Sequence, residues 1–178
     1  MFRKLASTVL GLSLLFVPEV KATGNHEDHR VLWDSLERAG VSILLNDTNL
    51  CDNGASGMYS PAHKILVVCQ DDRLPLTSRE VEWTSNDYDT LRHEAHHVLQ
   101  DCLDGIDNST IVPLFRDDNL KEFVTNALTQ RQIKSIIDTY REAGGDDDVI
   151  RTELEAFAVA SSVTPGTIAQ GIDKNCRI

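Results

Sequence analysis

The chain has 178 residues and a formal net charge of −11; 41% of its residues are hydrophobic and 25% are charged. These are ordinary values for a globular protein, and the length is sufficient for one domain with a proper core. The acidic balance argues against a nucleic acid or an anionic membrane surface as the partner, because both require basic patches. None of the four cysteines lies in a Cys-x-x-Cys pair, so a thiolate zinc site is not expected.

The N-terminus has the pattern of a secretory signal peptide over residues 1–22. A basic start precedes the mostly apolar run from Leu5 to Val17, and Val20-Lys21-Ala22 has apolar or small residues at the −3 and −1 positions of a cleavage site. An uncleaved anchor and a buried N-terminal helix are the alternatives, but the run is short for a membrane span. We expect cleavage after Ala22, a mature domain over 23–178, and a secreted or periplasmic protein without membrane attachment.

Outside the cytoplasm, four cysteines predict two disulfides. Cys51 and Cys69 bracket a loop that leads into a predicted strand, so we pair them. Cys102 is then joined to Cys176 near the C-terminus. Four cysteines allow three pairings, and buried free thiols are the remaining interpretation.

Hydrophobic periodicity predicts a mainly helical α+β domain with a small mixed or antiparallel sheet packed on the central helix. Helices are expected over residues 25–39, about 87–103, 118–143 and 152–162. Strands are expected over residues 41–45 and 63–69. Residues 46–60 are predicted as turns, 71–86 as a polar connection, and the segment after Thr164-Pro165-Gly166 as a tail. Ser85 or Asp87 is the expected N-cap of the second helix, and the run Asp146-Asp147-Asp148 offers the N-cap of the last.

The stretch from Asp89 to Gln100 contains the His-Glu-x-x-His motif as His93, Glu94 and His97. On an α-helix the two histidines lie one turn apart on the same face, where their imidazoles can bind one Zn²⁺ ion. Glu94 then lies beside the metal, where it can accept a proton from a metal-bound water and pass it to a leaving amine. His96 lies off this line and is expected to be solvated or to support the site without binding the ion.

A catalytic zinc ion usually has three protein ligands, so one more residue is required. The metzincin continuation of the motif fails, because Gln100 and Leu103 stand where its glycine and last histidine would be. Glu153 and Glu155 lie in an otherwise apolar helical stretch, where an ionised carboxylate is costly to bury unless it is paired or bound to a metal. The two side chains project to nearly opposite sides of a helix, so both cannot bind one ion.

With these residues the chain resembles the gluzincin type of zincin metallopeptidase. In that group a glutamate from a later helix, often in a Glu-x-x-Ala setting, joins the histidine pair. Glu153 matches this setting with Ala156, and Glu155 matches it with Ala158. We choose Glu153 as the third ligand and keep Glu155 as the alternative. The resemblance also implies that the strand before the motif helix, residues 64–70, is a sheet edge that accepts an extended peptide.

One position departs from the gluzincin pattern. Many members have an aspartate four residues after the ligand glutamate, where it orients a zinc histidine. For Glu153 that position is Phe157. Asp101, Asp104 and Tyr140 are candidates for the missing orienting residue.

The sequence therefore predicts a secreted zinc-dependent peptidase acting on a peptide or protein substrate. Zn²⁺ is held by His93, His97 and Glu153, and Glu94 acts as base and then acid. One alternative is a non-catalytic zincin-like domain that binds metal or recognises a protein, which the missing aspartate favours. Another is a disulfide-bonded secreted protein without metal. The sequence indicates neither a cleavage preference nor an oligomeric state.

Overall fold

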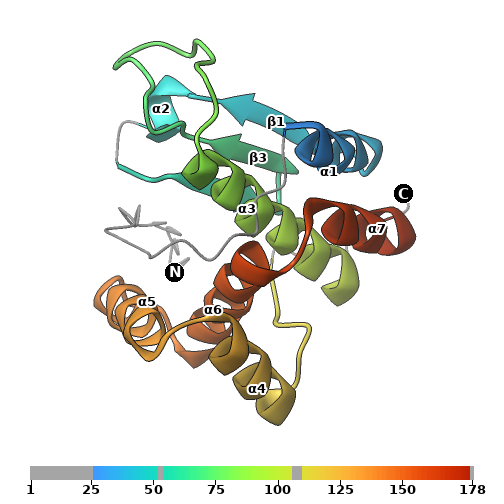
Figure 1. Ribbon diagram of the computed structural model, residues 1–178, viewed down its shortest axis with the longest axis vertical. Coiled ribbons are helices and arrows are strands. Elements are labelled where there is room, and N and C mark those ends of the chain that lie inside the picture. Colours follow the sequence, from blue (N-terminus) through green and yellow to red (C-terminus); the bar gives the residue numbers. More distant parts are fainter. Residues whose placement is uncertain (1–25, 52–53, 106–109, 177–178) are drawn as a thin grey trace, which may run out of the picture.

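The computed structural model describes residues 26–51, 54–105 and 110–176, so the predicted signal peptide lies outside the described residues. The described part is a mainly helical α+β domain with one small mixed sheet, which confirms the predicted fold class (Figure 1). Its elements in chain order are α1 (His26–Arg38), β1 (Ser42–Leu45), α2 (Thr48–Cys51), β2 (Gly57–Ser60), β3 (Ile65–Val68), α3 (Ser85–Asp104), α4 (Asp117–Ala127), α5 (Gln130–Glu142), α6 (Asp147–Ser162) and α7 (Pro165–Asn175).

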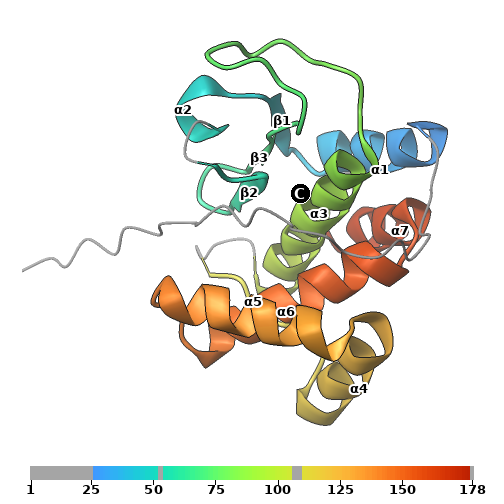
Figure 2. The same cartoon turned by 60° about the vertical axis from the view of Figure 1, so that its left-hand side comes forward.

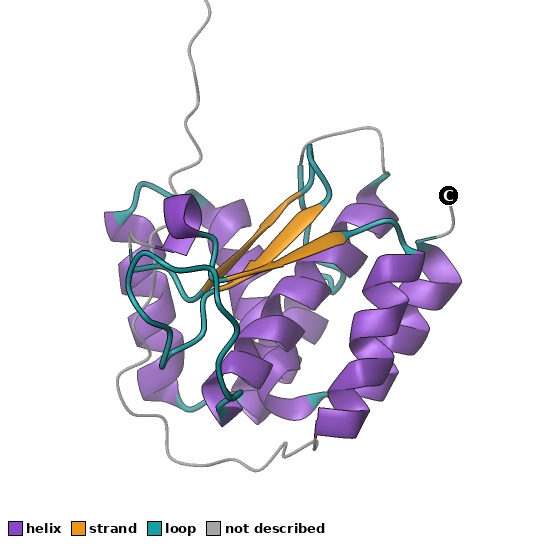
Figure 3. Ribbon diagram, turned by 90° about the horizontal axis from the view of Figure 1, so that it is seen from above, coloured by secondary structure: helices purple, strands orange, loops and turns teal. Residues whose placement is uncertain are grey.

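The sheet lies at one end of the molecule, and α4, α5 and α6 lie at the other, with α3 between them (Figure 1). The three strands lie side by side as one layer across the helices (Figure 3). A core of apolar side chains joins the sheet to α1, α3 and α7 and is nearly closed to solvent. Its fully buried members include Leu32, Leu36, Leu66, Ala95 and Ile172.

The central strand of the sheet is β3. It pairs in parallel with β1, with Ser42 opposite Ile65, and antiparallel with β2, with Gly57 opposite Val68. The prediction that residues 64–70 form a sheet edge is therefore wrong, because both sides of β3 are paired. β2 was missed because its four residues lie among turn-forming ones and are too few to show an alternating pattern. β2 is the edge strand that lies toward α5 and α6 in both views (Figures 1 and 2).

Helix α3 begins with a capping box. The side chain of Thr84 accepts from the backbone N–H of Asp87, and the Asp87 carboxylate accepts from the backbone N–H of Thr84 at 2.8 Å. The N-cap is thus Thr84 rather than Ser85 or Asp87. At the other side of the helix, the buried Arg92 donates to the carbonyl of Ala160 at 2.9 Å, which ties α3 to α6.

The predicted long helix over 118–143 is two helices, α4 and α5. The chain turns at Leu128, and Thr129 starts a new capping box with Gln132. The apolar spacing hides the break, because the stripes of both helices pack on the same side of α6.

The C-terminal segment is also helical. Asp146, the first of the three predicted aspartates, caps α6, and the helix begins at Asp147, five residues before the predicted start at residue 152. The predicted tail forms α7, with Thr164 as N-cap and Pro165 in the first turn. Proline ends one helix and suits the start of the next, because the first backbone N–H groups need no partner within the helix.

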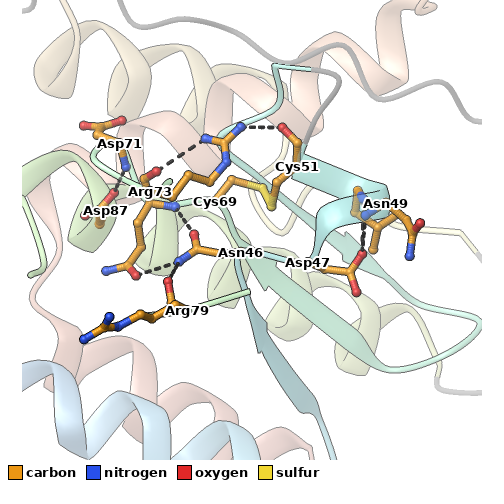
Figure 4. Close-up of a disulfide and its surroundings, with 11 residues drawn as sticks. Asn46, Asp47, Asn49, Cys51, Cys69, Asp71, Arg73, Arg79 and Asp87 are labelled. Atoms are coloured by element: carbon orange, nitrogen blue, oxygen red, sulfur yellow. Dashed lines mark hydrogen bonds between the residues drawn. A yellow bond between two sulfur atoms is a disulfide. The ribbon is translucent and has the colours of Figure 1, made fainter. Parts of the chain in front are cut away.

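Two disulfides form in the described part of the chain, Cys51–Cys69 and Cys102–Cys176. They indicate that the protein folds in an oxidising environment. The first lies beside a buried polar cluster in which the amide of Asn46 donates to Gln70 at 2.9 Å and to the carbonyl of Arg79 at 2.8 Å (Figure 4). These bonds hold the polar connection between β3 and α3 onto the sheet. Among the described helices, none has both the length and the apolar character that a membrane span requires.

The two disulfides differ in the length of chain that they close. The separation is 74 residues for Cys102–Cys176 and 18 for Cys51–Cys69. A cross-link that closes a longer loop restricts the unfolded chain more. We expect the Cys102→Ser/Cys176→Ser variant to lose about 1 kcal/mol more free energy of unfolding than the Cys51→Ser/Cys69→Ser variant. Urea unfolding of both variants at one pH measures this, and equal losses would contradict it.

Candidate metal centre

The side chains of His93, His97 and Glu153 converge on one point between α3 and α6. The Nε2 atoms of the two histidines are 3.1 Å apart, and Glu153 Oε2 lies 3.2 Å from His93 Nε2 and 3.6 Å from His97 Nε2. His93 and His97 come from successive turns of α3, and α6 packs directly on that helix. The structure thus brings together the three residues that the sequence proposed as ligands.

The three atoms fit the geometry of a metal site. Tetrahedral zinc with bonds of about 2.0–2.1 Å separates its ligand atoms by roughly 3.3 Å, and the three separations here range from 3.1 to 3.6 Å. Two imidazoles and one carboxylate are a donor set that suits first-row divalent ions. Three protein ligands also leave a fourth tetrahedral position for another group. The site can therefore hold a metal ion.

The electrostatics of the ligands favour a cation. Burial raises the pKa of Glu153, but the neighbouring His97 and His93 outweigh it and hold that pKa well below its usual range. Burial lowers the pKa of His97, yet the carboxylates of Glu153 and Glu94 raise it to about 9. Burial also lowers the pKa of His93. A metal ion that binds here meets an ionised Glu153 and displaces a proton from His97.

Glu94 is buried beside this cluster, with 6% of its surface exposed. Burial raises its pKa to about 8, and the backbone N–H of Tyr59 on β2 donates a hydrogen bond to its carboxylate. Gly57, also on β2, lies so close that an added Cβ would be 3.1 Å from Glu94 Cγ and 2.6 Å from Thr90 Cγ2. The edge strand therefore holds the Glu94 side chain in place by a hydrogen bond and by close packing.

The residue that orients His97 is Gln100, whose Oε1 lies 2.7 Å from His97 Nδ1. Gln100 was not among the predicted candidates, although a spacing of three residues on one helix predicts such contact. Asp101 instead accepts from the hydroxyl of Tyr59 at 2.7 Å, and Asp104 accepts from Thr110 at 2.8 Å. Of the three predicted candidates, only Tyr140 contacts the cluster, through a hydrogen bond from its hydroxyl to Glu153.

Phe157 stands where the gluzincin pattern has an aspartate, and its ring packs edge-on against His93 with centroids 4.4 Å apart. No hydrogen-bond partner of the buried His93 Nδ1 is found among the described residues. The two histidines are thus held in different ways, His97 by a hydrogen bond and His93 by packing.

Glu155, the alternative ligand, is fully buried and bonded elsewhere. Its carboxylate lies 2.7 Å from His96 Nε2 and accepts from the backbone N–H groups of Leu114 at 3.0 Å and Phe115 at 2.9 Å. His96 is only 3% exposed, so the first of its two expected roles, a solvated side chain, is wrong. It is buried because α6 covers that side of α3 and provides a carboxylate for the ring.

A comparison of the chain with models of known families, with curated proteins and with solved structures finds no match. The chemistry of the site is therefore inferred from its own residues. Two observations carry that inference, namely the spacing of the three ligand atoms and the buried carboxylate of Glu94 next to them.

Gly57 tests how closely β2 packs on Glu94. A methyl group at this position would also lie 2.9 Å from the carbonyl oxygen of Val67, which belongs to the neighbouring strand and cannot move alone. We expect Gly57→Ala to lower the free energy of unfolding by about 1–3 kcal/mol through overpacking. Gly166→Ala is the matched control, because nothing lies within 4 Å of its added Cβ. Denaturant unfolding measures the free energy of unfolding of both variants, and an equal change in the two would contradict the close packing of β2 on Glu94.

The raised pKa of His97 predicts a pH dependence of metal affinity. Because the ring must lose its proton to bind a cation, affinity should keep rising with pH until about 9. In chelator-treated protein the same proton stabilises the fold below about pH 6.5, and this contribution is lost as the pH rises through about 9. Chelator competition measures the metal affinity, and urea unfolding measures the stability, both between about pH 6 and about pH 9. A metal affinity that stops rising above neutral pH would contradict the raised pKa of His97.

Proposed function

We propose that the protein is a secreted zinc-dependent peptidase. The observation that carries this proposal is the convergence of His93, His97 and Glu153 with the buried carboxylate of Glu94 beside them. Imidazole and carboxylate ligands with one open position are the donor set of catalytic zinc sites. Zinc held there supplies a Lewis acid for the scissile carbonyl and lowers the pKa of water. The two disulfides support an extracellular or periplasmic location.

Glu94 is the proposed general base and acid. Burial raises the pKa of Glu94 to about 8, close to neutral pH, so its ionised form is basic enough to accept a proton and can release it again to a leaving amine nitrogen. The N–H of Tyr59 and the close approach of Gly57 keep the carboxylate in one position. Burial raises the pKa of Tyr140, so its hydroxyl stays protonated and donates to Glu153, which supports the orientation of that ligand.

The edge strand β2 is the proposed binding surface for the substrate backbone. One side of β2 is paired with β3, and the backbone at Tyr59 on its other side contacts Glu94. An extended peptide that adds to this edge as a further strand would pass directly beside Glu94 and the ligand cluster. This assignment replaces residues 64–70, which occupy the centre of the sheet.

A non-catalytic metal-binding domain is the second candidate. It is favoured by Phe157 in place of an orienting aspartate and by the absence, among the described residues, of a partner for His93 Nδ1. A histidine that lacks a hydrogen-bonded partner is a less basic and less firmly placed ligand. Such a domain would bind metal and cleave no peptide.

The variant Glu94→Gln separates the two candidates. It keeps the shape of the side chain but removes its ability to carry a proton, so hydrolysis of a mixed peptide pool should fall by at least about 100-fold. Zinc content, measured by elemental analysis, should stay the same, because Glu94 is not a ligand. Glu122→Gln, on the exposed side of α4, is the matched control and should keep full activity. A wild-type protein that binds zinc and cleaves nothing would support the non-catalytic domain instead.

A further inference from the structure

We propose that Glu155 is a positioning residue for the metal site, acting through the amide of Gln100 on the ring of His97. The three residues form one chain of hydrogen bonds from the interior of α6 to the metal-facing side of α3. The consequence for catalysis rests on the proposed function, whereas the effect on the ring does not.

Glu155 is a fixed acceptor. No part of its side chain is exposed, and Oε1 accepts from Gln100 Nε2 at 3.1 Å as well as from the backbone N–H of Leu114. Oε2 accepts from the N–H of Phe115, and His96 Nε2 completes the set at Oε1. An ionised carboxylate can only accept hydrogen bonds, and donors from α3 and from the segment before α4 surround this one. Its position is therefore set from several directions.

This acceptor decides which way the amide of Gln100 points. The amide nitrogen faces Glu155 Oε1 at 3.1 Å and the carbonyl oxygen of Thr152 at 3.4 Å. Both are acceptors, so turning the amide over would place its oxygen against two other oxygens. Gln100 Oε1 is consequently held toward His97, where it lies 2.7 Å from Nδ1.

The amide oxygen in turn decides the tautomer of the neutral ring. An amide oxygen can only accept, so Nδ1 of His97 must carry the hydrogen. Once the ring is neutral, its lone pair is at Nε2, the atom that faces His93 Nε2 and Glu153 Oε2. Glu155 thereby presents the metal-binding atom of His97 to the ion. The chain uses a carboxylate relayed through an amide where many zinc sites use a carboxylate on the histidine itself.

Two variants break the chain at different links. Glu155→Gln replaces the acceptor by an amide, and Gln100→Ala removes the link but leaves Glu155 its bonds to Leu114, Phe115 and His96. Each should lower zinc affinity by about 10- to 100-fold, measured by chelator competition. Each should also speed the hydrogen exchange of the His97 ring N–H, observed by ¹⁵N NMR on metal-free and zinc-loaded protein. Glu122→Gln and Gln130→Glu, both exposed, are the controls.

The exchanged pair Gln100→Glu/Glu155→Gln distinguishes positioning from a general loss of packing. In this double variant a carboxylate at position 100 can accept from His97 Nδ1, and the amide at position 155 can donate to that carboxylate. Zinc affinity should recover part of the loss that Gln100→Glu alone or Glu155→Gln alone produces, whereas the losses from two independent packing defects would add. Circular dichroism establishes that each variant is folded.

The proposal is overturned if Glu155→Gln and Gln100→Ala keep the zinc affinity and the slow ring N–H exchange of the wild type. It is equally overturned if the exchanged pair binds zinc no more tightly than the weaker-binding of its two single variants, Gln100→Glu and Glu155→Gln. A wild-type protein that cleaves no peptide would reject the proposed function alone, because neither readout depends on turnover. If Glu155→Gln does not fold, Gln100→Ala decides the question.

Discussion

The structure depends on two carboxylates of one helix that pack against another, Glu153, which is partly buried, and Glu155, which is fully buried. Removing an ionised carboxylate from water is costly unless hydrogen bonds or opposite charge replace the lost hydration. Helix α3 provides both, with His93 and His97 for Glu153 and with His96 and Gln100 for Glu155. The packing of α6 on α3 therefore also brings together the three residues that can hold a metal ion.

The same carboxylates give the site its asymmetry. Glu153 faces two imidazoles whose Nε2 atoms converge, so its charge is available to a cation. Glu155 is surrounded by hydrogen-bond donors, so its charge is used within the protein. These two glutamates are only two positions apart, but the α-helix turns their side chains to different sides. Different groups cover those two sides, so the two carboxylates have different roles.

The edge of the sheet completes the arrangement from the opposite side of α3. Tyr59 donates its N–H to Glu94 and its hydroxyl to Asp101, so β2 is attached to α3 at two points. Gly57 lets the strand approach α3 closely at Thr90 and Glu94. The proposed base is consequently positioned by the strand that is also proposed to bind the substrate backbone. In the proposed function, this single short strand would link substrate recognition to proton transfer.

The sequence alone determined what depends on local spacing. It located the motif helix and its histidines, the mainly helical class with a small sheet, and a cysteine pairing that matches both disulfides. Strand β2, the break at Leu128 and the helix at the C-terminus depend on packing partners far along the chain, and local pattern does not reveal those. Only the tertiary structure placed Glu153 rather than Glu155 beside the histidines and brought Glu155 to Gln100. Both glutamates fit the same local pattern, and the rotation of α6 against α3 decides which of them meets the two imidazoles.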